Sequence, residues 1–72
     1  KQGGFKVGSR LRALRTLKNV PAKKIAETLN ITIDSYYLKE RGKNRFTLDE
    51  AKKISDILKM SIEEVFYSTS NI

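Results

Sequence analysis

Residues 21–42 read PAKKIAETLNITIDSYYLKERG, and their apolar side chains recur at helical spacing. Ile25, Ala26 and Leu29 form one apolar stripe, which is typical of a short amphipathic helix. Pro21 suits the first turn of that helix, because the N–H group that proline lacks would have no partner there. The small side chain of Ala26 lets a second helix approach closely. The first half of the stretch therefore predicts a short helix packed against a neighbour.

The second half of the stretch predicts a tight turn and another helix. Asn30 suits the left-handed residue that ends the preceding helix. Thr32 suits the N-cap of the next helix, with Ile31 and Tyr36 as the apolar pair on either side of the cap. Gly42 suits the end of this second helix. Two short helices joined by a three-residue turn have the spacing of a helix-turn-helix.

Three further helices are expected around this pair. A first helix is expected from about Val7 to a break at Asn19 and Val20, on the helical spacing of Leu11, Leu14 and Leu17. Two capping boxes, at residues 47–50 (TLDE) and 61–64 (SIEE), predict the starts of a fourth and a fifth helix. The fourth helix carries a face that is expected to lie in the core, formed by Leu48, Ala51, Ile54 and Leu58.

The patterns together predict an all-α protein. They indicate a compact five-helix bundle with a central helix-turn-helix, over residues 7–67. A loose N-terminal arm is expected over residues 1–6 and a C-terminal tail over residues 68–72. No alternating pattern of the kind that predicts strands competes with this interpretation.

The charge of the chain is uneven. Its 72 residues include 15 Lys and Arg against 8 Asp and Glu, which gives a formal net charge of +7. Twelve of these cations but only three of the acids lie in residues 1–46. A basic half can be no more than a solvated surface, or it can be a face that binds a polyanion.

The composition also excludes several functions. The sequence has no cysteine and no histidine, so it lacks the commonest general base, the commonest metal ligand and the thiolates of zinc sites. No apolar run reaches the roughly 18 residues of a membrane span. We therefore expect a small cytoplasmic binding module that is not an enzyme, with no metal, cofactor, small-molecule ligand or membrane partner.

Four stretches carry a family resemblance: residues 8–15 (GSRLRALR), 36–51 (YYLKERGKNRFTLDEA), 54–58 and 62–66 (IEEVF). They resemble the phage-repressor-type (XRE/Cro-type) helix-turn-helix domain, which is lambda-repressor-like in fold, and in particular its branch in Firmicute phages and mobile elements. The resemblance implies a five-helix DNA-binding domain that reads operators, usually as a dimer. It also implies an ion pair between Arg15 and Glu40 that joins the first helix to the end of the third.

The sequence departs from the family pattern at three positions. Ala22 and Ile33 stand where the family often has glutamine, and Tyr37 stands where a small or polar residue is usual. The operator therefore cannot be carried over from the family. Ile33 and Leu38 can touch thymine methyl groups, and Asp34 can accept a hydrogen bond from cytosine N4. An apolar recognition surface is equally compatible with a protein partner.

The predicted function is sequence-specific binding of double-stranded DNA by a transcriptional regulator, of the phage or mobile-element repressor or Cro-like kind. The alternative is a helix-turn-helix module that binds another regulator rather than DNA. The third helix would lie in the major groove. The residues expected nearest the base edges are Ile33, Asp34, Ser35, Tyr37, Leu38 and Asn44. Those expected at phosphates are Ala22 (through its backbone N–H), Lys23, Thr32, Lys39, Arg41, Lys43 and Arg45.

A homodimer on DNA is the last expectation. One domain of this size reads only about four to six base pairs, and pairing two copies doubles the site. Tyr67 and the tail through Ile72 are expected to contribute to the contact between copies. The alternative is that Tyr67 caps the core of its own domain and that Ile72 is frayed.

Overall fold

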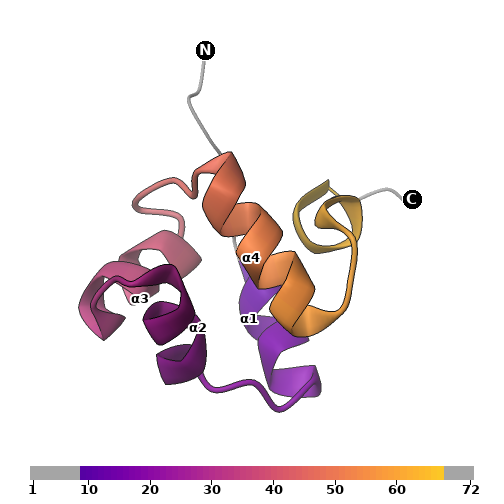
Figure 1. Cartoon of the computed structure of the whole chain (residues 1–72), viewed down its shortest axis with the longest axis horizontal. Coiled ribbons are helices and arrows are strands. Elements are labelled where there is room, and N and C mark those ends of the chain that lie inside the picture. Colours follow the sequence, from indigo (N-terminus) through magenta and orange to yellow (C-terminus); the bar gives the residue numbers. More distant parts are fainter. Residues whose placement is uncertain (1–8, 68–72) are drawn as a thin grey trace.

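Five helical elements account for the architecture of the described residues, which are 9–67 in this computed structural model, without the side chains of Ser9 and Tyr67 (Figure 1). They are α1 (Ser9–Leu17), α2 (Ala22–Leu29), α3 (Ile33–Glu40), α4 (Leu48–Leu58) and the π-helical turn η1 (Glu63–Tyr67). No strand occurs in this part of the chain. The all-α bundle predicted from the sequence is confirmed. Its fifth element is a single π-helical turn, of the kind that occurs in short pieces.

The two helices of the helix-turn-helix end and begin where the local signals predict. Asn30 adopts the left-handed conformation, with φ 62°, and the N–H of Ile31 donates to the carbonyl of Ala26 at 3.0 Å. The hydroxyl of Thr32 accepts the N–H of Ser35 at 3.1 Å, which caps α3. α2 and α3 pack directly against each other.

Pro21 requires a small correction. It precedes α2 as the N-cap instead of standing in its first turn, because its ψ of 146° is extended rather than helical. Both predicted capping boxes form. Thr47 and Glu50 exchange backbone-to-side-chain hydrogen bonds of 3.0 and 3.1 Å, and Ser61 and Glu64 do so at 2.9 and 3.0 Å.

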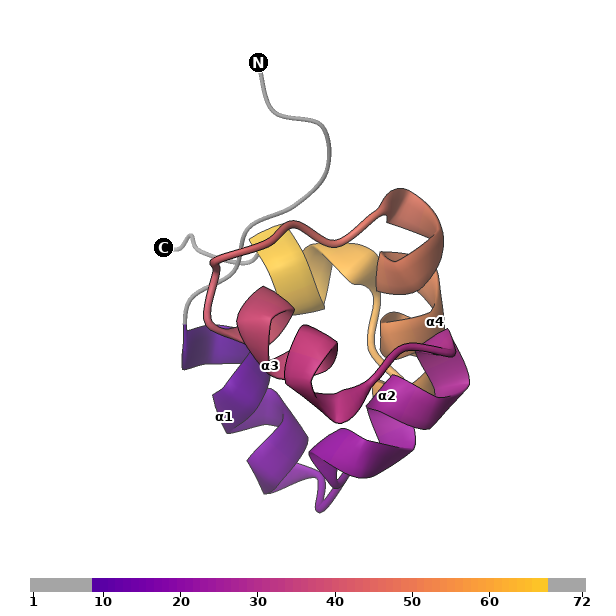
Figure 2. The ribbon, with the colours of Figure 1, turned by 90° about the vertical axis from the view of Figure 1, so that its left-hand side faces the viewer.

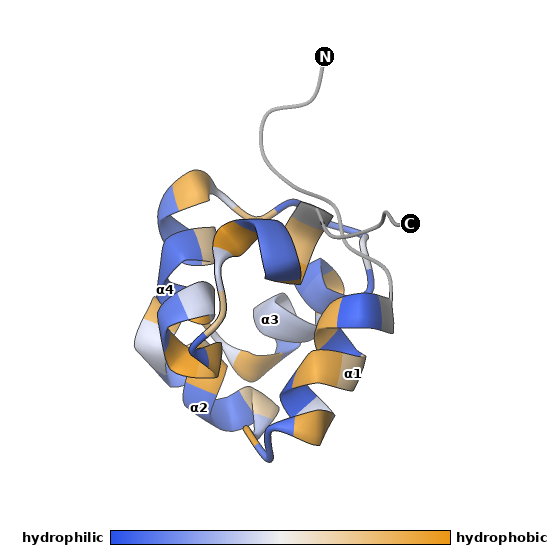
Figure 3. Ribbon diagram, turned by 90° about the vertical axis from the view of Figure 1, so that its right-hand side faces the viewer, coloured by the Kyte–Doolittle hydropathy of each residue, from blue (hydrophilic) through white to orange (hydrophobic). Residues whose placement is uncertain are grey.

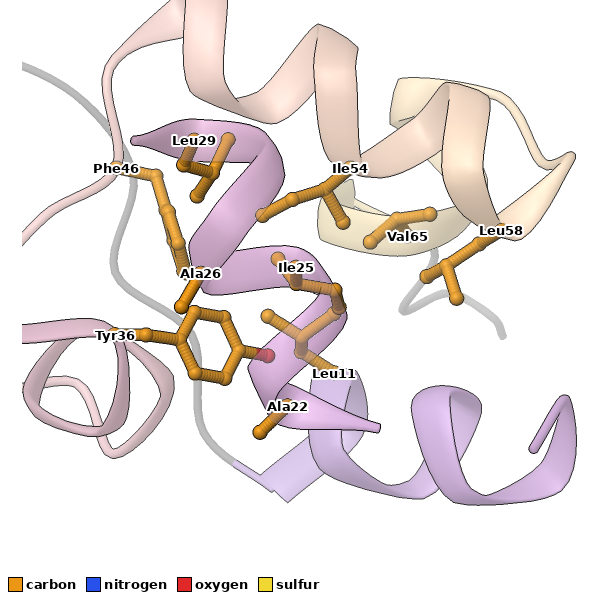
Figure 4. Packing of buried hydrophobic residues seen from close by; sticks show 10 residues of the cluster. All are labelled: Leu11, Ala22, Ile25, Ala26, Leu29, Tyr36, Phe46, Ile54, Leu58 and Val65. Carbon is orange, nitrogen blue, oxygen red and sulfur yellow. The ribbon is translucent and has the colours of Figure 1, made fainter. Parts of the chain in front are cut away.

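The core lies where all five elements meet (Figure 4). The aromatic rings of Tyr36 and Phe46 are fully buried beside each other, with their centroids 6.3 Å apart. Along the ribbon of each helix, hydrophobic residues alternate with hydrophilic ones (Figure 3), as expected for amphipathic helices around one core. The other fully buried large side chains are Leu11, Ile25, Ile54, Leu58 and Val65.

Two leucines of the predicted apolar stripes are not in the core. Leu48 is 59% exposed and Leu17 is 75% exposed. Each stands at an end of its helix, and in both cases a residue of the adjoining turn packs in or against the core. Phe46 does so before α4, and Val20 packs against the core after α1. The prediction that Leu48 is a core residue was wrong.

Candidate nucleic-acid interface

α3 presents one side to solvent and the other to the core. In Figure 2 it lies at the front of the molecule, with α2 beneath it and the loop between α3 and α4 above it. Ile33, Tyr37 and Leu38 are 36%, 38% and 37% exposed, and Asp34 is exposed as well. Ser35 is half-buried. The predicted base-contacting residues of α3 therefore share one accessible surface, which we call the outward face of α3 (Ile33, Asp34, Ser35, Tyr37 and Leu38).

The opposite side of α3 holds a buried ionic cluster. Glu40 is only 4% exposed, and its carboxylate accepts two hydrogen bonds from the Arg15 guanidinium, at 2.7 Å from Nε and 3.3 Å from Nη2. The hydroxyl of Tyr36 donates to the same carboxylate at 2.8 Å. Arg15 Nη1 also donates to the carbonyl of Val20 at 3.3 Å. The cluster thus ties α1, the α1–α2 turn and α3 together, and the structure brings Arg15 and Glu40 together as the family resemblance implied.

The ionisation of this cluster follows from its contacts. The hydrogen bond to Glu40 raises the pKa of Arg15, because it stabilises the charged guanidinium. Burial raises the pKa of Tyr36, and the hydrogen bond that its hydroxyl donates to Glu40 raises it further. The arrangement therefore holds a guanidinium and a neutral phenol on one carboxylate. This is a structural assembly and needs no catalytic role.

Lys39 is used inside the domain, which does not support the phosphate contact predicted for it. Its ammonium donates to the carbonyl of Arg45 at 2.9 Å and to the carboxylate of Glu50 at 3.1 Å. It also lies 5.8 Å from the centre of the Phe46 ring. The long methylene stem of Lys39 lets its ammonium reach from α3 to Arg45 on the loop and to Glu50 on α4. These contacts hold the loop that follows α3 in place.

The side chain of Ala22 is 5% exposed and belongs to the core. Its backbone N–H, the group predicted to meet a phosphate, is therefore all that this residue can offer there. The hydroxyl of Thr32 is used as the cap of α3, although its side chain is exposed. Neither residue presents a cation, so any contact with DNA at these positions would come from neutral donors.

The remaining predicted phosphate ligands surround α3. Lys23 is exposed on the first turn of α2, and Arg41, Lys43 and Arg45 are exposed on the α3–α4 loop. The predicted base contact Asn44 is exposed on the same loop. This loop is held to α3 by its backbone, since the N–H groups of Lys43 and Asn44 both donate to the carbonyl of Leu38, at 2.9 and 3.3 Å.

Gly42 lets this loop turn back along α3. Its φ is 83°, a left-handed conformation that glycine adopts without the steric cost of a side chain. Exposed cations therefore follow directly on the C-terminal end of α3, and others stand on α2, the helix that packs against α3.

Two contacts were not foreseen from the sequence. Arg10 donates to the carbonyl of Glu64 from Nε at 3.0 Å and from Nη2 at 2.6 Å, which ties α1 to η1. Glu50, besides its predicted place in the Thr47 capping box, accepts a hydrogen bond from Lys39. Both contacts join residues of different helices and follow no spacing rule. Lys24, exposed beside Lys23, adds a further cation to the start of α2.

Two searches of residues 9–67 have negative results. They contain no group of three or more acidic, histidine or cysteine side chains that could hold a metal ion. They also contain no helix that is long and apolar enough to cross a membrane.

Comparison with known proteins identifies the family. The sequence model of the helix-turn-helix family matches residues 11–65, which include all of α2, α3 and α4. The chain belongs to the helix-turn-helix family. Relatives include uncharacterized HTH-type transcriptional regulators of Sinorhizobium medicae (strain WSM419) and Rhizobium meliloti (strain 1021), each 35% identical over 60 residues. This match covers 83% of the chain but 43% of each relative, so the chain spans less than half the length of these curated relatives.

Proposed function

We propose that this helix-turn-helix domain binds double-stranded DNA and regulates transcription, with α3 in the major groove. The observation that carries the proposal is the placement of exposed cations around an exposed helix of the helix-turn-helix unit. Lys23 is exposed on the first turn of α2, which packs against α3, and the exposed Arg41 and Lys43 follow directly on the end of α3. Clustered cations of this kind match the phosphates that border a groove. The names of the two rhizobial relatives, both HTH-type transcriptional regulators, support it.

We propose different roles for the cations around α3 and for the residues of its outward face. The loop and the start of α2 would hold phosphates and set the register of the domain on the duplex, without reading sequence. The outward face of α3, together with Asn44, would meet the base edges. We assign the phosphate contacts to Lys23, Arg41, Lys43 and Arg45, with Lys24 added and Lys39 removed, and with neutral contacts from Thr32 and the Ala22 N–H.

A second function has a specific observation in its favour. Three large apolar side chains, Ile33, Tyr37 and Leu38, are exposed on one short helix. Such a surface also fits a protein partner, so a helix-turn-helix module that binds another regulator is the alternative. We favour DNA because the loop that carries Arg41 and Lys43 is held to α3 by its backbone, and an apolar protein site has no need of such cations.

The finer parts of the proposal rest on the sequence. A role as a phage or mobile-element repressor or Cro-like protein follows from the family resemblance, while the relatives named above come from rhizobia. We propose that the protein acts in the cytoplasm, where its DNA is, and uses no cofactor, metal or catalytic group.

We also propose that two copies bind a palindromic site. The assigned contact, the side chain of Tyr67 and residues 68–72, lies outside the described residues. Sedimentation with and without a palindromic duplex tests the pairing. One copy bound per duplex, and a monomer without DNA, would contradict it.

The salt dependence of duplex binding tests the main proposal. With about five phosphate contacts per domain, log affinity should fall against log salt with a slope near −4.5. Lys43→Ala should make that slope shallower by about 0.9. Lys59→Asn removes the same charge from the end of α4, at a left-handed position that Asn tolerates, and should leave the slope unchanged. A slope near zero for the wild type would contradict DNA binding and favour the protein-partner alternative.

A further inference from the structure

The outward face of α3 has an unusual chemistry for a protein surface. Among the residues that the structure describes, five large hydrophobic side chains are exposed, and three of them lie on this eight-residue helix. The exposed face of a surface helix is ordinarily polar. A cluster of exposed apolar side chains indicates a binding surface, and its chemistry limits what can be bound.

The outward face has no group suited to reading a purine with two hydrogen bonds. That contact uses Arg or Lys on guanine and Asn or Gln on adenine. α3 reads IDSYYLKE, so Lys39 is its single side chain of these four types. The ammonium of Lys39 donates to the Arg45 carbonyl and to Glu50, which directs it away from the outward face. On α3 only hydroxyl groups, the Asp34 carboxylate and apolar surface remain to meet the bases, and Asn44, the one other proposed base contact, lies on the loop beyond this helix.

One base presents an apolar group in the major groove, and that base is thymine, through its C5 methyl group. Apolar side chains gain free energy from covering this methyl group, as they do from any apolar surface removed from water. The carboxylate of Asp34, on the first turn of α3, can accept only from an amino group, such as cytosine N4. The exposed cations on the loop after α3 and on the neighbouring α2 match phosphates, which favours a groove of DNA as the partner of this apolar surface.

We infer that Ile33 and Leu38 read thymine methyl groups in the major groove, so that the part of the site that α3 covers is specified by thymines rather than by purine hydrogen bonds. The inference rests on the proposed DNA binding and names the chemical group that is recognised. Asp34 contributes one cytosine preference at the start of α3. Tyr37, four residues after Ile33 and on the same side of the helix, extends the apolar surface.

Replacement of thymine by uracil tests the inference directly, because it removes the methyl group and leaves the base-pairing edge and the backbone intact. Duplexes that the wild-type protein selects from a random pool are synthesised twice, with thymine and with uracil. We expect the uracil duplex to bind more weakly, by about four-fold for each methyl group contacted, which corresponds to one buried methyl. The random pool, before selection, gives the non-specific affinity.

Variants assign the effect to residues. Ile33→Ala and Leu38→Ala should each bring the thymine-to-uracil affinity ratio closer to one. Leu17→Ala truncates an equally apolar and more exposed side chain at the end of α1, which is not part of the outward face of α3, and should keep the wild-type ratio.

Two failures can be told apart. If the protein binds selected duplexes with the expected salt slope but a thymine-to-uracil ratio near one, the methyl inference is overturned and the DNA-binding proposal stands. If it binds no duplex at all, the DNA-binding proposal itself fails, and the methyl inference fails with it. A large ratio that neither Ile33→Ala nor Leu38→Ala reduces would overturn the assignment to these residues.

Discussion

The two sides of α3 reverse the usual distribution of polarity. The side that faces the core carries a carboxylate and a phenol, Glu40 and Tyr36, whereas the side that faces solvent carries Ile33, Tyr37 and Leu38. The inward side is tolerable because its polar groups bind one another and Arg15. The outward side is tolerable only if something else covers it. The inward bonds hold the helix in place, and we propose that its outward face recognises its target by shape and apolar contact.

This reversal separates orientation from recognition. The hydrogen bonds of Arg15 and Tyr36 to Glu40 fix the rotation of α3 about its own axis, because a buried charge that moves off its partner is costly. The exposed residues of the outward face hold no buried charge in place, so we expect that they can be substituted without loss of the fold. Substitutions on the two sides should therefore separate cleanly into effects on stability and effects on DNA.

The largest expected effect comes from breaking the buried pair. Arg15→Met leaves Glu40 charged and buried, and should lower the free energy of unfolding by about 3–5 kcal/mol. A domain of this size has little more than that in total, so the variant should be largely unfolded. Urea unfolding followed by circular dichroism measures the change.

Two further variants control this result. Arg12→Met removes an exposed cation from the same helix and should cost no more than about 0.5 kcal/mol. Arg15→Met combined with Glu40→Gln should lower the free energy of unfolding by less than the sum of the two single changes, because no buried charge is left without a partner. Equal losses for Arg12→Met and Arg15→Met would mean that the cluster does not hold α3.

An intermediate effect is expected at Lys39, which joins α3 to the loop beyond it. Lys39→Met removes the donors to Arg45 and Glu50 but keeps most of the apolar stem, and should cost about 1–2 kcal/mol. It should also weaken DNA binding, because the loop that carries Lys43 loses an anchor. The salt slope should stay the same if Lys39 is engaged by Arg45 and Glu50 and not by a phosphate, as we propose.

Lys43→Met provides the matched comparison for Lys39, because it removes an exposed cation from that loop. It should cost little stability but make the salt slope shallower by about 0.9. If Lys39→Met made the salt slope equally shallow, this would support the phosphate contact that the sequence predicted for Lys39.

The smallest effect is expected at Tyr36 and depends on pH. Tyr36→Phe removes one hydrogen bond to Glu40 and should cost about 1 kcal/mol at neutral pH. Burial raises the pKa of Tyr36 in the folded chain, so folding favours the protonated phenol. Its contribution is complete below the ordinary tyrosine pKa of 10.0 and is lost as the pH rises above that value.

Unfolding at pH 8 and above pH 10 measures this effect. The stability difference between the wild type and Tyr36→Phe should shrink at the higher pH. In the wild type alone, unfolding then releases the Tyr36 proton, and this release favours the unfolded state. Tyr37→Phe, a change at the exposed neighbouring tyrosine, is the matched control for alkaline effects on the rest of the chain. A constant difference over this range would show that the Tyr36 phenol does not favour its protonated form in the folded state.

Much of the fold was predictable because its signals are local. The Asn30 end of α2, the Thr32 cap of α3 and both capping boxes depend on residues within four positions of each other, so the sequence contains each signal whole. The pairing of Arg15 with Glu40 was available through the family resemblance, since 25 residues separate them and no spacing rule connects them.

The order of the helices, their caps and the identity of the helix-turn-helix could thus be determined from the sequence alone, because helix formation follows the spacing of neighbouring residues. The directions in which individual side chains point could not be determined from the sequence alone. Whether Lys39 reaches a phosphate or Glu50, whether Ala22 is a surface or a core residue, and whether Leu48 is covered all depend on segments distant along the chain. Burial is a property of what packs against a residue, and for this protein only the tertiary arrangement of α2, α3 and α4 supplies those neighbours.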